Sequence, residues 1–174
     1  MIIKFNELDS IRKNNENKKI GICKGSFDIF HYSHLMLFKY IKNECDILVV
    51  ILKNDDDVRK KGINRPIFNE KERLEMIDNI KFVDYAILQK DKEETKLINT
   101  LIYNNKYSEK EIEKLTKDGC LYEKINADYL YVTEDKKISK SIVDLCNKIN
   151  LQIKIIPIQG NNFHTSDIIN KIIS

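Results

Sequence analysis

The stretch that follows the first apolar run of the chain reads Gly25-Ser26-Phe27-Asp28-Ile29-Phe30-His31-Tyr32-Ser33-His34. A glycine at the end of a strand allows a sharp turn and lets a ligand approach the backbone. The two histidines are three residues apart, so both imidazoles project to one side once a helix begins. Free N–H groups and the helix dipole favour an anion at that end. The stretch therefore predicts a strand, a turn and a helix start that can hold a polyphosphate.

Two other interpretations of the histidine pair stay open at this point, which are chance placement and half of a zinc site. A zinc site needs three or four protein ligands, and only Asp28, Cys23 and Cys45 lie near in the sequence. The chain has just three histidines, and the third, His164, falls in another motif described below. This distribution favours the phosphate interpretation.

Apolar runs alternate with helical patterns along the chain. The strands that we expect are nearly continuous in apolar residues, as buried parallel strands require, and they are Ile20–Cys23, Ile47–Leu52, Tyr85–Leu88, Tyr129–Val132 and Ile153–Ile156. The expected helices are His34–Asn43, Glu70–Ile80, Thr95–Tyr103, Glu109–Lys117, Ser139–Ile149 and Ser166–Ile173. The alternation predicts an α/β fold with an open, mostly parallel five-stranded sheet and helices on both faces. Ligands of such sheets bind at the carboxyl ends of the strands.

Length and composition narrow the class of protein. The chain has 174 residues, of which 42% are hydrophobic and 33% charged, so we expect one folded domain rather than a disordered chain. We expect residues 1–18 to form a peripheral arm and residues 91–126 to form an insertion. A net charge of +3 with scattered basic residues argues against a nucleic-acid partner.

Cellular placement is also an expectation from composition. The longest unbroken apolar run, Ile47–Leu52, is too short to span a membrane, and Met1–Ser10 does not have the pattern of a secretory signal. The four cysteines are widely spaced, so we expect free thiols and a cytoplasmic protein.

The pattern Gly-x-Phe-Asp-x-x-His-x-x-His after a first strand resembles the cytidylyltransferase-like nucleotidyltransferases. This family includes glycerol-3-phosphate cytidylyltransferase, the choline- and ethanolamine-phosphate enzymes, heptose-phosphate adenylyltransferases and archaeal-type FAD synthetases. The resemblance implies a Rossmann-like fold of the HxxH type, catalytic roles for His31 and His34, and a homodimer. It also implies nucleotide contacts from Gly25, Ser26, Phe27 and Asp28. The chain departs from the family at Ser33, where a glycine is usual.

A second set of candidate residues follows the second expected strand. An acidic turn, Asn54–Asp57, precedes the basic residues Arg59, Lys60, Lys61 and Arg65, and a basic loop of this kind can bind phosphates. A solvated charged loop is the alternative. The resemblance implies that Lys61 grips phosphates during catalysis and that Asp55 and Lys60 contact the acceptor. It also implies a nucleotide contact from Lys81, where the family often has arginine.

A third set lies in the last part of the chain. Hydroxyl groups at a helix start can cap the helix or receive a phosphate. Residues 162–169 are similar to the Ile-Ser-Thr-Thr-x-Ile motif of the family, which implies nucleotide contacts from His164, Thr165 and Ser166. Thr133 falls in a weaker match. The arginine that precedes this motif in glycerol-phosphate enzymes is missing from the run Ile158–Asn162.

The resemblance implies transfer of CMP from CTP to a small phosphorylated alcohol, with Mg²⁺ as cofactor and release of pyrophosphate. Two alternatives stay open: an adenylyltransferase that uses ATP, of the ADP-sugar or FAD-synthetase type, and a nucleotide-binding protein without activity. We expect no protein ligand to a resident metal.

Overall fold

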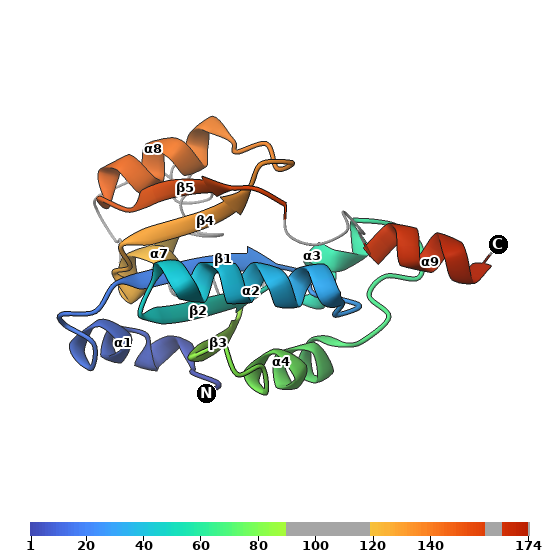
Figure 1. Cartoon of the computed structure of the whole chain (residues 1–174), viewed down its shortest axis with the longest axis horizontal. Helices are drawn as coiled ribbons and strands as arrows, with labels where there is room; N and C mark the ends of the chain where they lie inside the picture. The colour runs from blue at the N-terminus through green and yellow to red at the C-terminus, as the bar shows by residue number, and fades with distance from the viewer. Residues whose placement is uncertain (90–118, 159–164, 174) are drawn as a thin grey trace.

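A parallel five-stranded sheet forms the centre of the protein (Figure 1). The computed structural model describes residues 1–89, 119–158 and 165–173. The strands are β1 (Ile20–Gly25), β2 (Ile47–Leu52), β3 (Tyr85–Leu88), β4 (Tyr129–Thr133) and β5 (Gln152–Ile156). They lie in the order β3-β2-β1-β4-β5, and every neighbouring pair is parallel. This confirms the α/β, Rossmann-like sheet and all five expected strands. The strand order reverses at β1, since β2 and β3 lie on one side of it and β4 and β5 lie on the other.

Helices connect the strands and cover the sheet. The described helices are the 3₁₀ turn η1 (Phe5–Glu7), α1 (Asp9–Lys13), α2 (Tyr32–Glu44), α3 (Asp55–Arg59), α4 (Glu70–Asp78), α7 (Gly119–Ile125), α8 (Lys140–Lys148) and α9 (Thr165–Ile173). Asn69 and Glu72 form the capping box expected at the start of α4. The expected helices Thr95–Tyr103 and Glu109–Lys117 lie outside the described residues.

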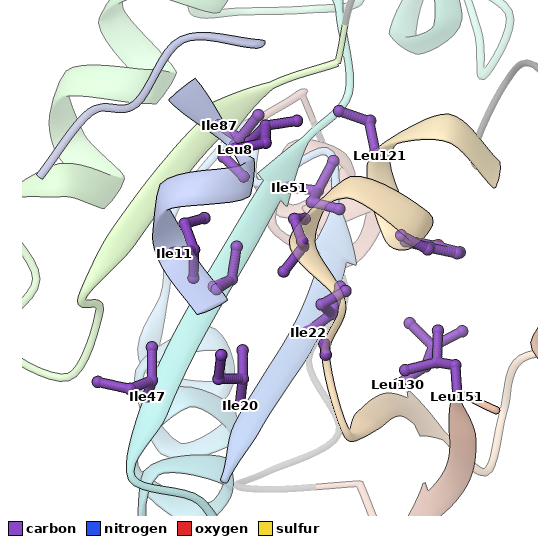
Figure 2. Packing of buried hydrophobic residues seen from close by; sticks show 14 of the residues in the cluster. Leu8, Ile11, Ile20, Ile22, Ile47, Ile51, Ile87, Leu121, Leu130 and Leu151 are labelled. Carbon is purple, nitrogen blue, oxygen red and sulfur yellow. The ribbon is translucent and has the colours of Figure 1, made fainter. Parts of the chain in front are cut away.

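Two apolar clusters fix the sheet between its helices. Because successive strand residues point to opposite faces, Ile47, Val49 and Ile51 of β2 join one cluster while Leu48, Val50 and Leu52 join the other. The first cluster, shown in Figure 2, includes side chains from α1, α7 and α8. The second includes side chains from α2 and α4. Both faces of the sheet are therefore covered, which explains why the strands read as continuous apolar runs.

The N-terminal arm, residues 1–18, is not peripheral as expected. Leu8 and Ile11 are 0% exposed and pack against the sheet (Figure 2). Ile2 forms a parallel bridge with Ala86 of β3, and Ile3 N donates to Ala86 O at 3.0 Å. The arm was expected to be peripheral because its composition is polar and rich in asparagine. Three of its apolar residues are nevertheless buried, namely Ile3, Leu8 and Ile11.

The expected insertion, residues 91–126, also needs a correction at its C-terminal end. Leu121, Tyr122 and Ile125 of α7 are buried in the first apolar cluster, so α7 is the crossover helix that precedes β4. The remainder of the expected insertion, 91–118, lies outside the described residues. Within the described part of the chain, no helix is long and apolar enough to cross a membrane.

Candidate functional site

The two motif histidines lie together at the N-terminus of α2. This helix begins at Tyr32, two residues earlier than expected, so His31 is the N-cap residue and His34 lies in the first turn. The two rings are stacked, with centroids 3.8 Å apart and an interplanar angle of 29°. In α2, which the structure describes in full, the first turn holds no acidic residue and no side chain caps the helix. The helix end therefore favours an anion beside both rings.

The ring of Phe27 packs against the ring of His34. Its ring is 4% exposed and makes edge contacts with His34 and Phe38, both at 5.1 Å between centroids. A Cβ atom on Gly25 would lie 2.5 Å from Phe27 Cζ, so the glycine makes room for this ring. The buried ring of Phe27 positions His34, and the expected contact of Phe27 with the nucleotide stays a prediction.

Lys61 extends to the same loop. Its Nζ donates to Ser26 Oγ at 2.6 Å, although the residue as a whole is exposed. Burial of the ammonium group lowers the pKa of Lys61 to about 8, and the positive charges of Lys53, Lys136 and Arg65 act in the same direction. We call these four residues the cationic cluster. Lys61 Nζ lies beside Ser26 and the other three charges lie near enough to act on it, an arrangement that favours binding of an anion.

Two members of the cationic cluster were missed by the sequence analysis. Lys53 directly follows β2, and its N–H donates to Gly25 O at 2.9 Å. Lys136 follows β4 and forms an ion pair with Asp135 at 2.6 Å. Both lie at the carboxyl edge of the sheet, and this position after an expected strand was the signal that could have identified them.

Asp28 anchors the basic loop. It is 1% exposed, and its Oδ2 accepts from Arg65 Nη1 at 2.9 Å. Its Oδ1 accepts from the N–H groups of Ile67 and Phe68, at 2.7 and 3.2 Å. Both carboxylate oxygens are thus occupied within the protein. In this structure Asp28 holds the loop that carries Lys61, and a contact with the nucleotide stays a prediction.

Arg73 joins three segments around the site. The side chain is 0% exposed, and its guanidinium donates to Ser26 O, to Phe68 O and to Asp55 Oδ1. The N–H of Asp55 in turn donates to Glu70 Oε2 at 2.9 Å. The sequence analysis assigned no function to Arg73.

Lys60 and Lys81 have contacts of their own on other elements. Lys60 is exposed and pairs with Asp57 on α3, and its contact with the acceptor stays a prediction. Lys81 precedes β3 and is exposed, with its Nζ 5.0 Å from the centre of the Phe82 ring. Since all strands are parallel, the start of β3 lies at the edge of the sheet opposite Gly25. This position does not favour the expected nucleotide contact from Lys81, which stays a prediction.

The remaining expected residues lie at the carboxyl edge or outside the described residues. Thr133 ends β4, beside Ile156 of β5, and its side chain bonds to Asp135. Although burial acts to raise the pKa of Asp135, hydrogen bonds from Lys136 and Thr133 lower it overall. Thr165 begins α9, which Figure 1 draws beyond the arrowheads of the strands. Ser166 belongs to that helix, and His164 lies outside the described residues.

The zinc interpretation finds no support in the described ranges. Cys23 and Cys45 are buried in the second apolar cluster, and Cys45 is the C-cap of α2, at the opposite end from His31. Among residues 1–89, 119–158 and 165–173, no three His, Cys, Asp or Glu side chains are placed to hold a metal ion.

A family model described as cytidylyltransferase-like matches residues 22–171. The chain belongs to the cytidylyltransferase-like family. This confirms the resemblance drawn from residues 25–34 and supports nucleotidyl transfer as the class of reaction.

Two curated relatives in this comparison are bifunctional proteins HldE. The one from Helicobacter pylori (strain P12) is 31% identical over 124 residues, which are 67% of this chain and 27% of that protein. The one from Campylobacter fetus subsp. fetus (strain 82-40) is 34% identical over 101 residues, 58% of this chain and 22% of that protein. The matched part of the chain thus spans about a quarter of each relative.

Solved structures share the fold. A lipopolysaccharide core biosynthesis protein from Thermoplasma volcanium GSS1 is 26% identical, with a TM-score of 0.57 over 84% of this chain and 100% of that chain. A pantoate-beta-alanine ligase from Francisella tularensis gives a TM-score of 0.62 at 20% identity, over 99% of this chain and 77% of that chain. This second likeness concerns the fold alone.

Proposed function

We propose that this protein transfers a nucleoside monophosphate from a nucleoside triphosphate to the phosphate group of a small acceptor, with release of pyrophosphate. The observation that carries the proposal is the stacked pair of His31 and His34 at an uncapped helix N-terminus. The cationic cluster beside Ser26 supports it, because a triphosphate needs several positive charges at one place.

The reaction needs no covalent intermediate with the protein. An oxygen of the acceptor phosphate forms a bond to the α-phosphorus, and the bond from that phosphorus to the bridging oxygen breaks as pyrophosphate leaves. The protein has to align the attacking oxygen and the leaving pyrophosphate with the α-phosphorus. It also has to stabilise the charge that develops on the phosphate oxygens. We assign hydrogen-bond donation to His31 and His34, and charge stabilisation to Lys61 with Lys53 and Lys136.

Mg²⁺ is part of this proposal as a companion of the triphosphate. Mg²⁺ keeps several waters and binds readily through substrate phosphates, and it would supply charge neutralisation on them. The described residues offer no cluster of carboxylates for a resident ion, so we propose that the ion arrives with the nucleotide. The chain's own residues then bind the oxygens that the ion leaves available.

ATP is the donor that we favour, with a sugar phosphate as acceptor. The named function of the Thermoplasma volcanium relative, lipopolysaccharide core biosynthesis, agrees with the heptose-phosphate adenylyltransferases within the resembled family. The run Ile158–Asn162 also lacks the arginine of the glycerol-phosphate cytidylyltransferases. The second candidate is transfer of CMP from CTP to a small phosphorylated alcohol, which the motif of residues 25–34 favours.

A nucleotide panel separates the two donors. ATP, CTP, GTP and UTP, each with Mg²⁺, are tested for their effect on the thermal unfolding midpoint, since a ligand that binds the folded state raises it. Each nucleotide is then incubated with a series of phosphorylated sugars, polyols and amino alcohols, and pyrophosphate is measured. ATP-dependent release supports the first candidate, and CTP-dependent release supports the second. If a nucleotide binds but no acceptor in the series gives pyrophosphate release, the result supports the alternative of a nucleotide-binding protein without activity.

The homodimer implied by the resemblance is a separate proposal. Sedimentation equilibrium over a range of protein concentrations gives the mass of the species in solution and tests it directly.

A further inference from the structure

Two adjacent lysines, Lys60 and Lys61, have partners of different charge. Lys60 Nζ pairs with the carboxylate of Asp57 on α3. Lys61 Nζ instead donates to a hydroxyl oxygen, Ser26 Oγ, at 2.6 Å, in the loop that follows β1. A carboxylate stabilises the charged ammonium form of a lysine, whereas a hydroxyl oxygen accepts a hydrogen bond from the ammonium and from the neutral amine alike. The environment of Lys61 thus tolerates the neutral amine better than that of Lys60.

The other members of the cationic cluster reach the loop after β1 from three different segments. Lys53 directly follows β2, whose last residue is paired with Gly25 at the end of β1. Lys136 follows β4, the neighbour of β1 on its other side. Arg65 is held by the buried carboxylate of Asp28, both oxygens of which accept hydrogen bonds from the basic loop. The order of the strands therefore places an amine at a site that attracts anions.

The surroundings of Lys61 also favour a reactive amine. Burial comes first among the causes that lower the pKa of Lys61 to about 8, and the positive charges of Lys53, Lys136 and Arg65 follow. A lysine beside other cationic groups is an activated nucleophile, because its neutral form is populated near neutral pH. The same cations attract a reagent that carries a phosphate group. Reactivity of the amine and attraction of an anion thus coincide at Lys61.

We propose that Lys61 is a site of acylation by acyl phosphates, the mixed anhydrides of a carboxylic acid and phosphoric acid. The cationic cluster binds the phosphate group of the reagent, and the neutral amine attacks its carbonyl carbon. A bond forms between Lys61 Nζ and that carbon. The bond from the carbon to the bridging oxygen breaks, and inorganic phosphate leaves with the electron pair. The nitrogen releases one proton to water, so the products are an amide, phosphate and a proton.

Acylation of Lys61 removes one positive charge from the cationic cluster. We therefore expect the modified protein to bind nucleoside triphosphates more weakly than the unmodified protein. The modification itself does not depend on the proposed function, because the reagent supplies the acyl group and the chain supplies the amine. Only its effect on turnover depends on that function.

Peptide mass spectrometry measures the rate at which acetyl phosphate acetylates each lysine of the whole chain at a pH near 8. Lys60 is the internal control, since it is adjacent and exposed but paired with Asp57. We expect Lys61 to react at least tenfold faster than Lys60. The N-hydroxysuccinimide ester of acetic acid transfers the same acetyl group without a phosphate. With this neutral reagent the ratio of the two rates should be at least threefold smaller, because the cationic cluster does not attract the reagent.

A matched pair of variants tests the contribution of the cationic cluster. Lys136→Gln removes one of its charges, and Lys137→Gln removes a charge at the next position, which is also exposed. Acetylation of Lys61 by acetyl phosphate should slow at least threefold in Lys136→Gln and stay within 1.5-fold of wild type in Lys137→Gln. Because both side chains lie on the surface, both variants should fold.

Three outcomes would overturn the inference. They are a Lys61 that reacts no faster than Lys60, a ratio of rates that is the same for both reagents, and equal slowing in the two variants. If Lys61 is acetylated selectively but no donor and acceptor release pyrophosphate, the modification site is supported and the proposed function is contradicted. Pyrophosphate release by a protein whose Lys61 resists acetyl phosphate gives the opposite result.

Discussion

The rings of His31 and His34 stack at 3.8 Å between centroids, and a third ring, Phe27, meets His34 edge-on from the core side at 5.1 Å. This contact fixes the position of one imidazole by packing against the apolar interior. The other imidazole, of the N-cap residue His31, stacks on the first. The pair is therefore held by the fold before any ligand binds, which is the condition for efficient electrostatic catalysis.

Removal of one ring should greatly reduce turnover. We expect His34→Ala to lower kcat at least a hundredfold, which corresponds to about 2.7 kcal/mol of lost transition-state stabilisation. Pyrophosphate release at saturating nucleotide measures this. Tyr32→Ala serves as a control on the same helical turn because the Tyr32 side chain is 61% exposed, and it should stay within threefold of wild type. A wild-type kcat for His34→Ala would remove the catalytic assignment.

The activity should fall at alkaline pH because of Lys61. Burial first, and then the nearby cations, lower the pKa of Lys61 to about 8, so the side chain is charged below that pH and neutral above it. Loss of the charge weakens phosphate binding, and kcat/KM should therefore decrease above pH 8, since this ratio reports groups of the free enzyme. Lys61→Arg keeps its charge throughout the range and should lose the alkaline decline. If Lys61→Arg shows the same alkaline decline of kcat/KM, the decline arises from another group.

The buried guanidinium of Arg73 should be important for stability. Arg73→Met leaves the carboxylate of Asp55 and two carbonyl groups without their donor, and loss of one partner of a buried ion pair costs about 3–5 kcal/mol. For a chain of this size the unfolding midpoint should fall by roughly 6–20 °C. Thermal unfolding followed by circular dichroism measures the change. Lys71→Met, at an exposed position on α4, is the matched control and should shift the midpoint little.

Gly25 should be intolerant of a side chain because the ring of Phe27 lies against it. In Gly25→Ala the added Cβ would lie 2.5 Å from Phe27 Cζ, so the ring must move and with it the support of His34. We expect kcat to fall at least tenfold with little change in secondary structure. Phe27→Leu in the Gly25→Ala background should restore part of the activity by making space. Full activity of the single variant would show that His34 does not depend on this contact.

The sheet was predictable because its strands are buried on both faces. The run Ile47–Leu52 carries no polar residue, and the bounds of β2 followed from it, whereas β1, β4 and β5 extend one or two residues beyond their apolar runs. The missed helices α1 and α3 have only five residues each, too few for a helical period to emerge. The burial of Leu8 and Ile11 depends on contacts with distant strands, which local composition does not encode.

The relative positions of site residues were predictable where the residues belong to one continuous motif. His31 and His34 are fixed relative to each other by a single helical turn, so their spacing in the sequence gave their geometry. The placement of Lys81 at the edge of the sheet opposite Gly25 was not predictable, because motif position alone does not tell which end of a strand a residue occupies. Lys53 and Lys136 were missed because they join Lys61 only through the order of β2, β1 and β4 in the sheet.

The bridge between Ile2 and Ala86 has a consequence for folding. Synthesis proceeds from the N-terminus, so the first residues leave the ribosome long before their strand partner exists. Closing a long loop has an entropic cost before its contacts form, and we therefore expect the arm to dock late. A chain paused during translation ahead of β3 would expose Leu8 and Ile11 to proteases and chaperones until synthesis resumes.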